Sequence, residues 1–378
     1  MFLAALCGTP GYAESVQVGN THYSLQLMTV DGAGTSVAVG DFNEDGFPDL
    51  AVTSKSDGGV FIFTGGKQES FAPLARYDAG REPSEIVASD LNGDGHLDLV
   101  IANHETRYVT LYDGDGKGGF SPAEASPLSI DVSPHPHIVR VADVNDDDVP
   151  DLIVDNRDKN GLLLIEGLGD GRFSSRGREI PTGGDPYLGF AIDDINADGL
   201  PDFVTPNTDH LGVALGKGTQ TLAYETYKRI AADRPFAVKL VDLNADKYLD
   251  IVYASMTGIV SVFFGDGSGE YNATNKMAMD FAAGAKRIAR GDINGDGVGD
   301  VMISNWSTDV MVVFGSDTVL VSHRFKPEGI ENPWMLQISD LNRDGKADLI
   351  VADGSGDKVA VYMSTTRNAL TGDKSSRQ

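Results

Sequence analysis

The sequence predicts an all-β fold: a seven-bladed β-propeller with four-stranded antiparallel blades, closed into a ring by an N-terminal strand. Three observations lead to this prediction. A nine-residue acidic motif occurs seven times, successive copies start 48 to 53 residues apart, and short runs rich in β-branched residues flank the copies. This period is typical of a four-stranded propeller blade rather than of a helical solenoid.

The motif reads Asp-x-Asn-x-Asp-x-x-x-Asp in every copy. The seven copies are DFNEDGFPD at 41, DLNGDGHLD at 90, DVNDDDVPD at 143, DINADGLPD at 194, DLNADKYLD at 242, DINGDGVGD at 292 and DLNRDGKAD at 340. Each copy therefore marks the same point in its own blade, and the ring is expected to have seven blades.

Each repeat is predicted to contain four strands. In the second repeat, SEIVASD precedes the motif, LDLVIAN overlaps its end, and YVTLYDG follows. A glycine-rich turn then leads to Phe120, which is expected to begin a weaker fourth strand. The acidic motif thus connects the first strand of a blade with the second.

The last repeat supplies only three strands before the polar tail at residues 367–378. An orphan strand, HYSLQLMTV at residues 22–30, is expected to complete that blade, because ring closure would remove both open sheet edges. The propeller is therefore assigned to residues 14–366. Residues 1–13 are interpreted as the remnant of a signal peptide that is cleaved after Ala13.

The leader expected at residues 1–13 predicts a secreted, periplasmic or cell-surface protein, and the charge of the chain limits its partners. Acidic residues outnumber basic ones 56 to 30, which gives a formal charge of −26 and disfavours nucleic acid or anionic lipid as a partner. No run of 18 apolar residues predicts a transmembrane segment. The single cysteine, Cys7, lies in the expected leader.

The acidic loops are predicted to bind calcium, up to seven ions in all, one per loop. Positions 1, 3, 5 and 9 of each motif present side-chain oxygens, the hard ligands that calcium prefers, and a glycine at position 6 permits a left-handed backbone. Turn formation alone is the alternative explanation. The predicted ligands are Asp41, Asn43, Asp45, Asp49, Asp90, Asn92, Asp94, Asp98, Asp143, Asn145, Asp147, Asp151, Asp194, Asn196, Asp198, Asp202, Asp242, Asn244, Asp246, Asp250, Asp292, Asn294, Asp296, Asp300, Asp340, Asn342, Asp344 and Asp348.

Two loops depart from the pattern, because Asp148 and Lys247 stand where the others have glycine. The loop Asp242–Asp250 is expected to bind calcium most weakly, since Lys247 adds a positive charge. Position 12 of each motif falls within a predicted strand and is not acidic, which excludes EF-hand-like helical calcium modules.

These motifs resemble the FG-GAP/VCBS repeats of the integrin α-subunit propeller and of many bacterial surface and secreted proteins. The resemblance covers about residues 21 to 364. It implies that metal ions occupy the loops between the first and second strands of the blades. It also implies that ligands bind on the opposite face of the ring.

Most candidate ligand-binding residues lie where the chain enters the first strand of a blade, six residues before a motif; Tyr187 lies one residue earlier, and His104 follows the second strand of its blade. The residues there are chemically diverse, as expected for a binding surface grafted on a regular repeat, although loop variation or packing between blades would also explain them. The predicted ligand-binding residues are His137, Tyr187, Phe236, Lys286, Trp334 and His104.

Three functional classes remain open: a ligand-binding or adhesion module for carbohydrate or protein, a polysaccharide-acting enzyme, and a passive scaffold. His104, His135 and His137 are expected to be neighbours and could abstract a proton, as in a polysaccharide lyase. The sequence contains neither G-x-S-x-G nor HExxH, so binding without catalysis is favoured. No oligomeric state is predicted.

Overall fold

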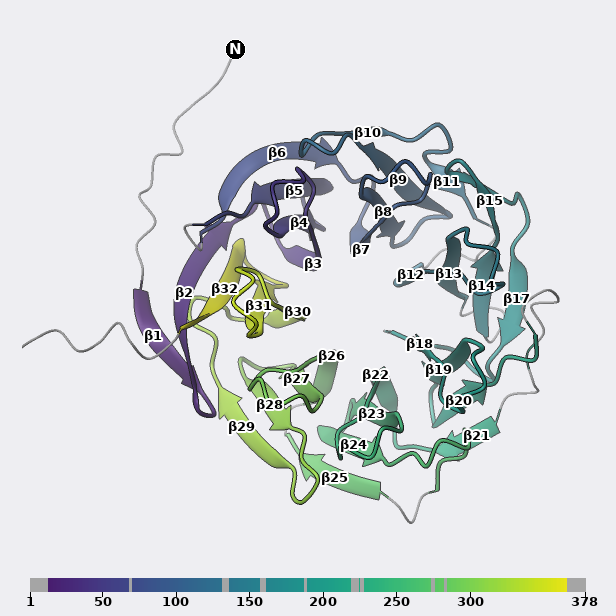
Figure 1. Ribbon diagram of the computed structural model, residues 1–378, viewed down its shortest axis with the longest axis vertical. Coiled ribbons are helices and arrows are strands. Elements are labelled where there is room, and N and C mark those ends of the chain that lie inside the picture. Colours follow the sequence, from purple (N-terminus) through teal and green to yellow (C-terminus); the bar gives the residue numbers. More distant parts are fainter. Residues whose placement is uncertain are drawn as a thin grey trace, which may run out of the picture.

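A computed structural model of the chain describes residues 13–67, 70–130, 136–156, 161–186, 189–218, 224, 228–272, 276–281 and 284–365. Every regular element in these ranges is a β-strand, and the strands form seven antiparallel blades around one axis (Figure 1). The predicted fold class is confirmed. None of the described segments forms a helix long and apolar enough to cross a bilayer.

The first and second strands of each blade meet at the acidic loop. The first strands line the ring axis; they are β3 (Gly34–Gly40), β7 (Pro83–Ser89), β12 (Val139–Ala142), β18 (Ala191–Asp193), β22 (Pro235–Val241), β26 (Ala285–Gly291) and β30 (Pro333–Ser339). The second strands are almost wholly buried; they are β4 (Asp49–Ser54), β8 (Asp98–Asn103), β13 (Asp151–Asn156), β19 (Asp202–Pro206), β23 (Asp250–Ser255), β27 (Asp300–Asn305) and β31 (Asp348–Asp353).

The third and fourth strands complete each blade toward the rim. The third strands are β5 (Gly59–Thr64), β9 (Tyr108–Gly114), β14 (Gly161–Ile165), β20 (His210–Ala214), β24 (Ile259–Phe263), β28 (Val310–Phe314) and β32 (Lys358–Thr365). The fourth strands are β6 (Ala72–Asp78), the pair β10 (Phe120–Pro122) and β11 (Leu128–Ser129), β17 (Arg178–Pro181), β21 (Lys228–Ala231), β25 (Lys276–Asp280), β29 (Val321–Phe325) and β2 (Thr21–Thr29).

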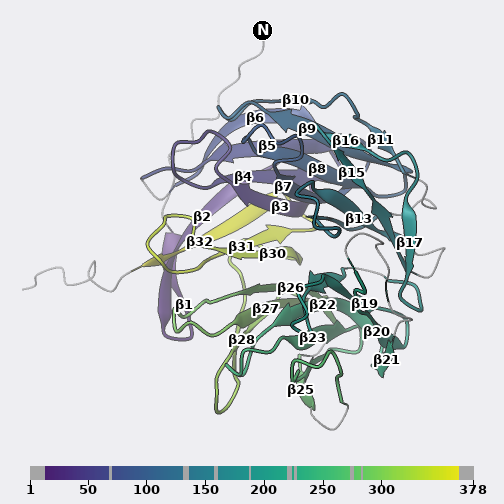
Figure 2. The ribbon, with the colours of Figure 1, turned by 45° about the vertical axis from the view of Figure 1, so that its right-hand side comes forward.

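The seventh blade is closed by the N-terminal strand, as the sequence predicts. β2 pairs antiparallel with β32, the last strand that the structure describes, and the two lie side by side in both views (Figure 1 and Figure 2). An additional strand, β1 (Ala13–Val18), pairs with the outer edge of β2 and was not predicted. Residues 1–12, most of the expected leader, and the tail at 367–378 lie outside the described residues.

The apolar core is divided into seven clusters, and each cluster fills the seam between two neighbouring blades. One seam, for example, joins Val60 and Ile62 of the first blade to Leu99 and Ile101 of the second, all fully buried. Alternate residues of a strand face opposite sides of its blade, so a central strand is apolar on both faces. A short hairpin, β15 (Gly167–Gly169) with β16 (Arg172–Phe173), is added to the third blade.

Candidate ligand-binding site

The seven acidic loops lie at one end of the ring and share one backbone conformation. The fourth and sixth residues of every motif have left-handed φ angles, between 56° and 93°. The left-handed backbone predicted at the sixth position is confirmed, even at Asp148 (φ 62°) and Lys247 (φ 76°). The fourth position was not predicted, because its residues range from glycine to Glu44 and Arg343.

Replacing Lys247 with glycine is expected to raise the free energy of unfolding by about 1 kcal/mol, because a side chain is strained at this φ angle. Urea denaturation of Lys247→Gly measures the change. The matched control is Lys346→Gly, which removes the same charge from the next position of another loop, where the backbone is not left-handed. Equal effects of the two substitutions would contradict the strain at Lys247.

The first and last aspartates of each motif hold the loop together. In the first loop, Asp41 accepts hydrogen bonds from the backbone N–H groups of Asp45 (3.1 Å) and Gly46 (2.9 Å). Asp49 is fully buried and accepts from Phe42 and Gly65, both at 2.9 Å, so it ties the loop to the end of the third strand. The last aspartates of the other six motifs make the same two bonds.

Burial raises the pKa of these last aspartates, to about 6 for Asp49 and about 7 for Asp250. The backbone donors oppose this effect, and the other aspartates of the same loop add to it. A divalent cation beside such a carboxylate would favour its ionised form.

The donor set of each loop suits calcium in kind: three carboxylates and one amide oxygen, with acceptor sites beyond those used by the backbone. Among the described residues, no three His, Cys, Asp or Glu side chains are gathered closely enough to hold a metal ion. Calcium binding therefore stays a prediction and is taken up below.

A cavity of about 270 Å³ lies on the ring axis at the end opposite the acidic loops, and we call it the axial pocket. Its lining comes from the starts of the first strands and from the loops that follow the second strands. The lining residues are Thr35, Lys55, Ser84, His104, His137, Phe236, Arg287, Trp306, Asn332, Trp334 and Gly354.

Aromatic residues form one side of the axial pocket. The ring of Trp306 packs edge-on against Phe236 and Trp334, with centroid distances of 5.6 and 5.9 Å. Trp306 is 47% exposed and Phe236 only 2%, so Phe236 forms the base of this side and Trp306 its open face. The fully buried Lys286 places its Nζ 4.9 Å from the Trp306 centroid and bonds to Asn332.

Two histidines form another side of the axial pocket. The rings of His104 and His137 lie 4.4 Å apart, which confirms that these two residues are neighbours. His104 Nδ1 is 3.2 Å from Glu82, and His137 Nδ1 is 3.2 Å from the buried Asp155. Burial and the proximity of His137 lower the pKa of His104, while Glu82 opposes this effect.

Comparison with known sequences identifies the repeat. The family described as FG-GAP-like repeat matches residues 41–101, 90–154 and 242–303, which contain five of the seven motifs. The three matched stretches fall in the blades of the propeller. The protein is a β-propeller of the FG-GAP repeat type.

Curated relatives share only a short segment with the FG-GAP propeller. Phosphatidylinositol-glycan-specific phospholipase D is 34% identical in Bos taurus and 32% identical in Mus musculus, in each case over 84 residues. The aligned segment covers 18% of this chain, and the chain spans about a tenth of the length of these relatives.

Solved structures resemble the whole ring. They include BBS1N in complex with ARL6DN, soaked with lead or with mercury, with TM-scores of 0.62 and 0.60. The alignments cover 90% of this chain and 95% or 94% of the other chain, at 12% and 14% identity. At such low identity the likeness concerns the fold alone.

Four of the six predicted ligand-binding residues of the FG-GAP propeller lie together in the axial pocket: His104, His137, Phe236 and Trp334. Lys286 is instead fully buried against the rings of Trp306 and Trp334 and bonds to Asn332, so it supports the lining of the pocket without being part of it. Tyr187 and His135 lie outside the described residues.

Trp306, Lys55 and Arg287 line the axial pocket and were not predicted. Lys55, His104 and Trp306 each stand 14 residues after the start of a motif, immediately after the second strand. This shared offset is the signal that could have found Trp306 and Lys55. Arg287 follows Lys286 on β26, one residue beyond the predicted position.

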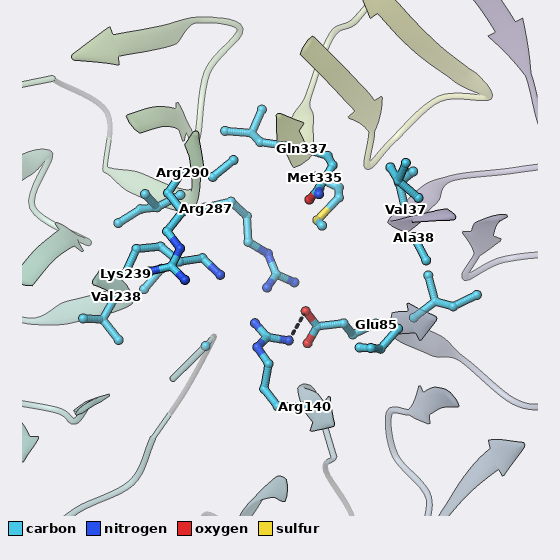
Figure 3. A pocket seen from close by; sticks show the side chains of 18 of the residues that line it. Val37, Ala38, Glu85, Arg140, Val238, Lys239, Arg287, Arg290, Met335 and Gln337 are labelled. Carbon is cyan, nitrogen blue, oxygen red and sulfur yellow. Dashed lines mark hydrogen bonds and ion pairs between the residues drawn. The ribbon is translucent and has the colours of Figure 1, made fainter. Parts of the chain in front are cut away.

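Below the axial pocket, a cavity of about 400 Å³ runs along the axis between the first strands, and we call it the axial channel. Glu85, Arg140, Lys239 and Arg287 project into it from four different blades (Figure 3). Arg140 is 2.6 Å from Glu85, while Arg290, which also lines the channel, is 3.1 Å from Asp193. Arg287 lines both cavities and therefore connects them.

Proposed function

We propose that this FG-GAP propeller is a ligand-binding module that holds one ligand in the axial pocket, on the face opposite the acidic loops. The observation that carries the proposal is the convergence of Trp306, Trp334 and the pair His104–His137 on one cavity. Aromatic faces provide large rigid contact areas, and the polar groups around them fix the orientation of a ligand.

A single site is favoured over seven equivalent ones. The chain has two tryptophans, and both line this one pocket. A carbohydrate residue suits the size and the aromatic side of the cavity. A protein ligand has support from the similar propeller BBS1N, which was crystallised in complex with ARL6DN.

We further propose that the acidic loops bind calcium and that the module works outside the cytoplasm. Seven copies of one oxygen-donor pattern support calcium, and loop sites of this kind suit the high calcium concentrations found outside cells. The bound ions would make the ring more rigid without contacting a ligand on the opposite face.

A glycan array probed in calcium and in EDTA tests this function. Calcium-dependent binding to a defined set of glycans would support a carbohydrate-binding module. Assay of the bound glycans for unsaturated products then tests the lyase alternative. If no glycan binds, carbohydrate is excluded as the ligand class. Candidate protein ligands are then tested for binding to the wild type and to variants of the axial pocket.

Replacing Trp306 with alanine is expected to weaken binding to the selected glycan at least tenfold, because a stacking surface is lost from the pocket. The melting temperature should change little, since the Trp306 side chain is half-exposed. Isothermal titration calorimetry and thermal melting measure the two effects. Tyr248→Ala is the matched control, because this 44% exposed aromatic residue lies in an acidic loop. Full affinity in Trp306→Ala would remove the axial pocket from the function.

A further inference from the structure

Two cations in the axial channel form no ion pair with the described carboxylates. Arg140 and Arg290 are each paired with a carboxylate, but in the described part of the chain no carboxylate oxygen lies within 4 Å of Arg287 or Lys239. Arg287 is only 8% exposed, and its Nε atom has no hydrogen-bond partner.

This arrangement is unfavourable in the free protein. A buried cation loses its hydration, and at Arg287 only the longer-range attraction of Glu85 and Asp155 and the ring of Trp334 offset that loss. Burial and the neighbouring Arg140 lower the pKa of Lys239 to about 7, and Arg287 and Arg290 act in the same direction. The chain as a whole carries a formal charge of −26, whereas four basic residues line the channel. The axis is therefore locally positive in a protein that is negative overall.

We propose that the axial channel binds an oxyanion group, a carboxylate, sulfate or phosphate, through Arg287 and Lys239. A guanidinium group presents a planar fork of N–H donors and an ammonium group presents three, and both form strong charge-assisted hydrogen bonds with oxyanions. Glu85 forms an ion pair with Arg140 and attracts Arg287 and Lys239 only at longer range, so their hydrogen-bond donors stay available to a ligand. The cavity of about 400 Å³ has room for a group of a few atoms.

The oxyanion site is continuous with the axial pocket. Arg287 lines both cavities, and its guanidinium carbon lies 5.5 Å from the centroid of the Trp334 ring. A ligand that contacts the tryptophans can therefore extend a negative group to Arg287. This part of the inference rests on the proposed function, and it specifies an acidic ligand, such as a carbohydrate that carries a carboxylate or a sulfate.

The test titrates the full-length protein with sulfate, phosphate and acetate by calorimetry at constant ionic strength in chloride. Arg287→Met and Lys239→Met are each expected to weaken binding at least tenfold. The matched controls, Arg76→Met and Lys228→Met, remove exposed cations from β6 and β21 at the rim and should bind like wild type. Melting without added oxyanion should be unchanged or higher for the two channel variants, because Arg287→Met removes a buried charge without an ion pair and Lys239→Met removes a partly buried one.

Failure of all three anions to bind, or wild-type affinity in both channel variants, would overturn the oxyanion site.

A second experiment compares the affinities for glucuronate and for glucose in the wild type, in Trp306→Ala and in Arg287→Met. Preference for glucuronate that is lost in both Trp306→Ala and Arg287→Met supports one ligand across both cavities. If the anions bind but Trp306→Ala binds glucuronate with wild-type affinity, the oxyanion site in the channel is supported and the proposed ligand site in the axial pocket is refuted. If Arg287→Met binds the selected glycan with wild-type affinity, the axial pocket is supported and the channel is not part of the ligand site.

Discussion

Chelation with EDTA is expected to lower the melting temperature of the calcium-loaded propeller by roughly 10 °C or more. An ion that binds only the folded state stabilises it by about 2.7 kcal/mol when present at about 100 times its dissociation constant. Three such sites would together contribute about 8 kcal/mol, which is comparable to the whole stability of many domains. Without the ions, three aspartates per loop repel one another, and the last of them is fully buried in every motif.

The stabilisation by calcium should differ among the loops, and a matched pair of substitutions measures the difference. Asp296→Asn and Asp246→Asn each remove one charge and keep the side-chain oxygen that accepts the backbone N–H two residues later. Each also loses the oxygen that accepts a bond from the Asn side chain two residues earlier, so the two substitutions are matched. Asp296→Asn should lower the melting temperature in calcium and have little effect in EDTA. Asp246→Asn should have a smaller effect, because its loop contains Lys247. Elemental analysis must first show that the protein is metal-loaded, and an EDTA-insensitive melt of that preparation would refute calcium binding.

The ring could be predicted from the sequence because the same pattern of strands and loop occurs in every repeat. One copy of DINGDGVGD would indicate only a turn, whereas seven copies at a regular spacing fix the blade count and the place of the loop in each blade. Closure by β2 followed from the missing fourth strand of the last repeat. β1 was missed because it packs on the outside of a completed blade, where no repeat requires a strand.

The channel could not be predicted in this way, because its charges come from separate repeats. Arg140, Lys239 and Arg287 each look like a solvated cation when read within their own strand. Register shifts near the start of the first strands, such as the one between Ala285 and Ile288, also change which residue faces the axis. In this stretch Lys286 is buried beside the tryptophans, while Arg287 reaches the cavities.

Deletion of residues 14–30 is expected to abolish cooperative folding of the propeller. β2 pairs with β32 at eight residues, so its loss would leave the edge of the seventh blade open to association with other chains. β2 and the residue after it also fill two seams. Tyr23 and Leu25 pack toward the sixth blade, and Met28 and Val30 pack toward the first, all at most 5% exposed. Burial of four such side chains contributes on the order of 8 kcal/mol.

Point substitutions on β2 separate the loss of these contacts from a general effect of truncation. Leu25→Ala should lower the free energy of unfolding by about 2 to 5 kcal/mol, because it leaves a cavity in the seam with the sixth blade. Leu27→Ala, two residues further along the same face of the strand but 39% exposed, should cost less than about 1 kcal/mol. Size-exclusion chromatography and urea denaturation measure the variants together with the deletion. A truncated protein that remains a monomer and unfolds in one transition at the wild-type midpoint would show that the other strands of the chain are sufficient to close the ring.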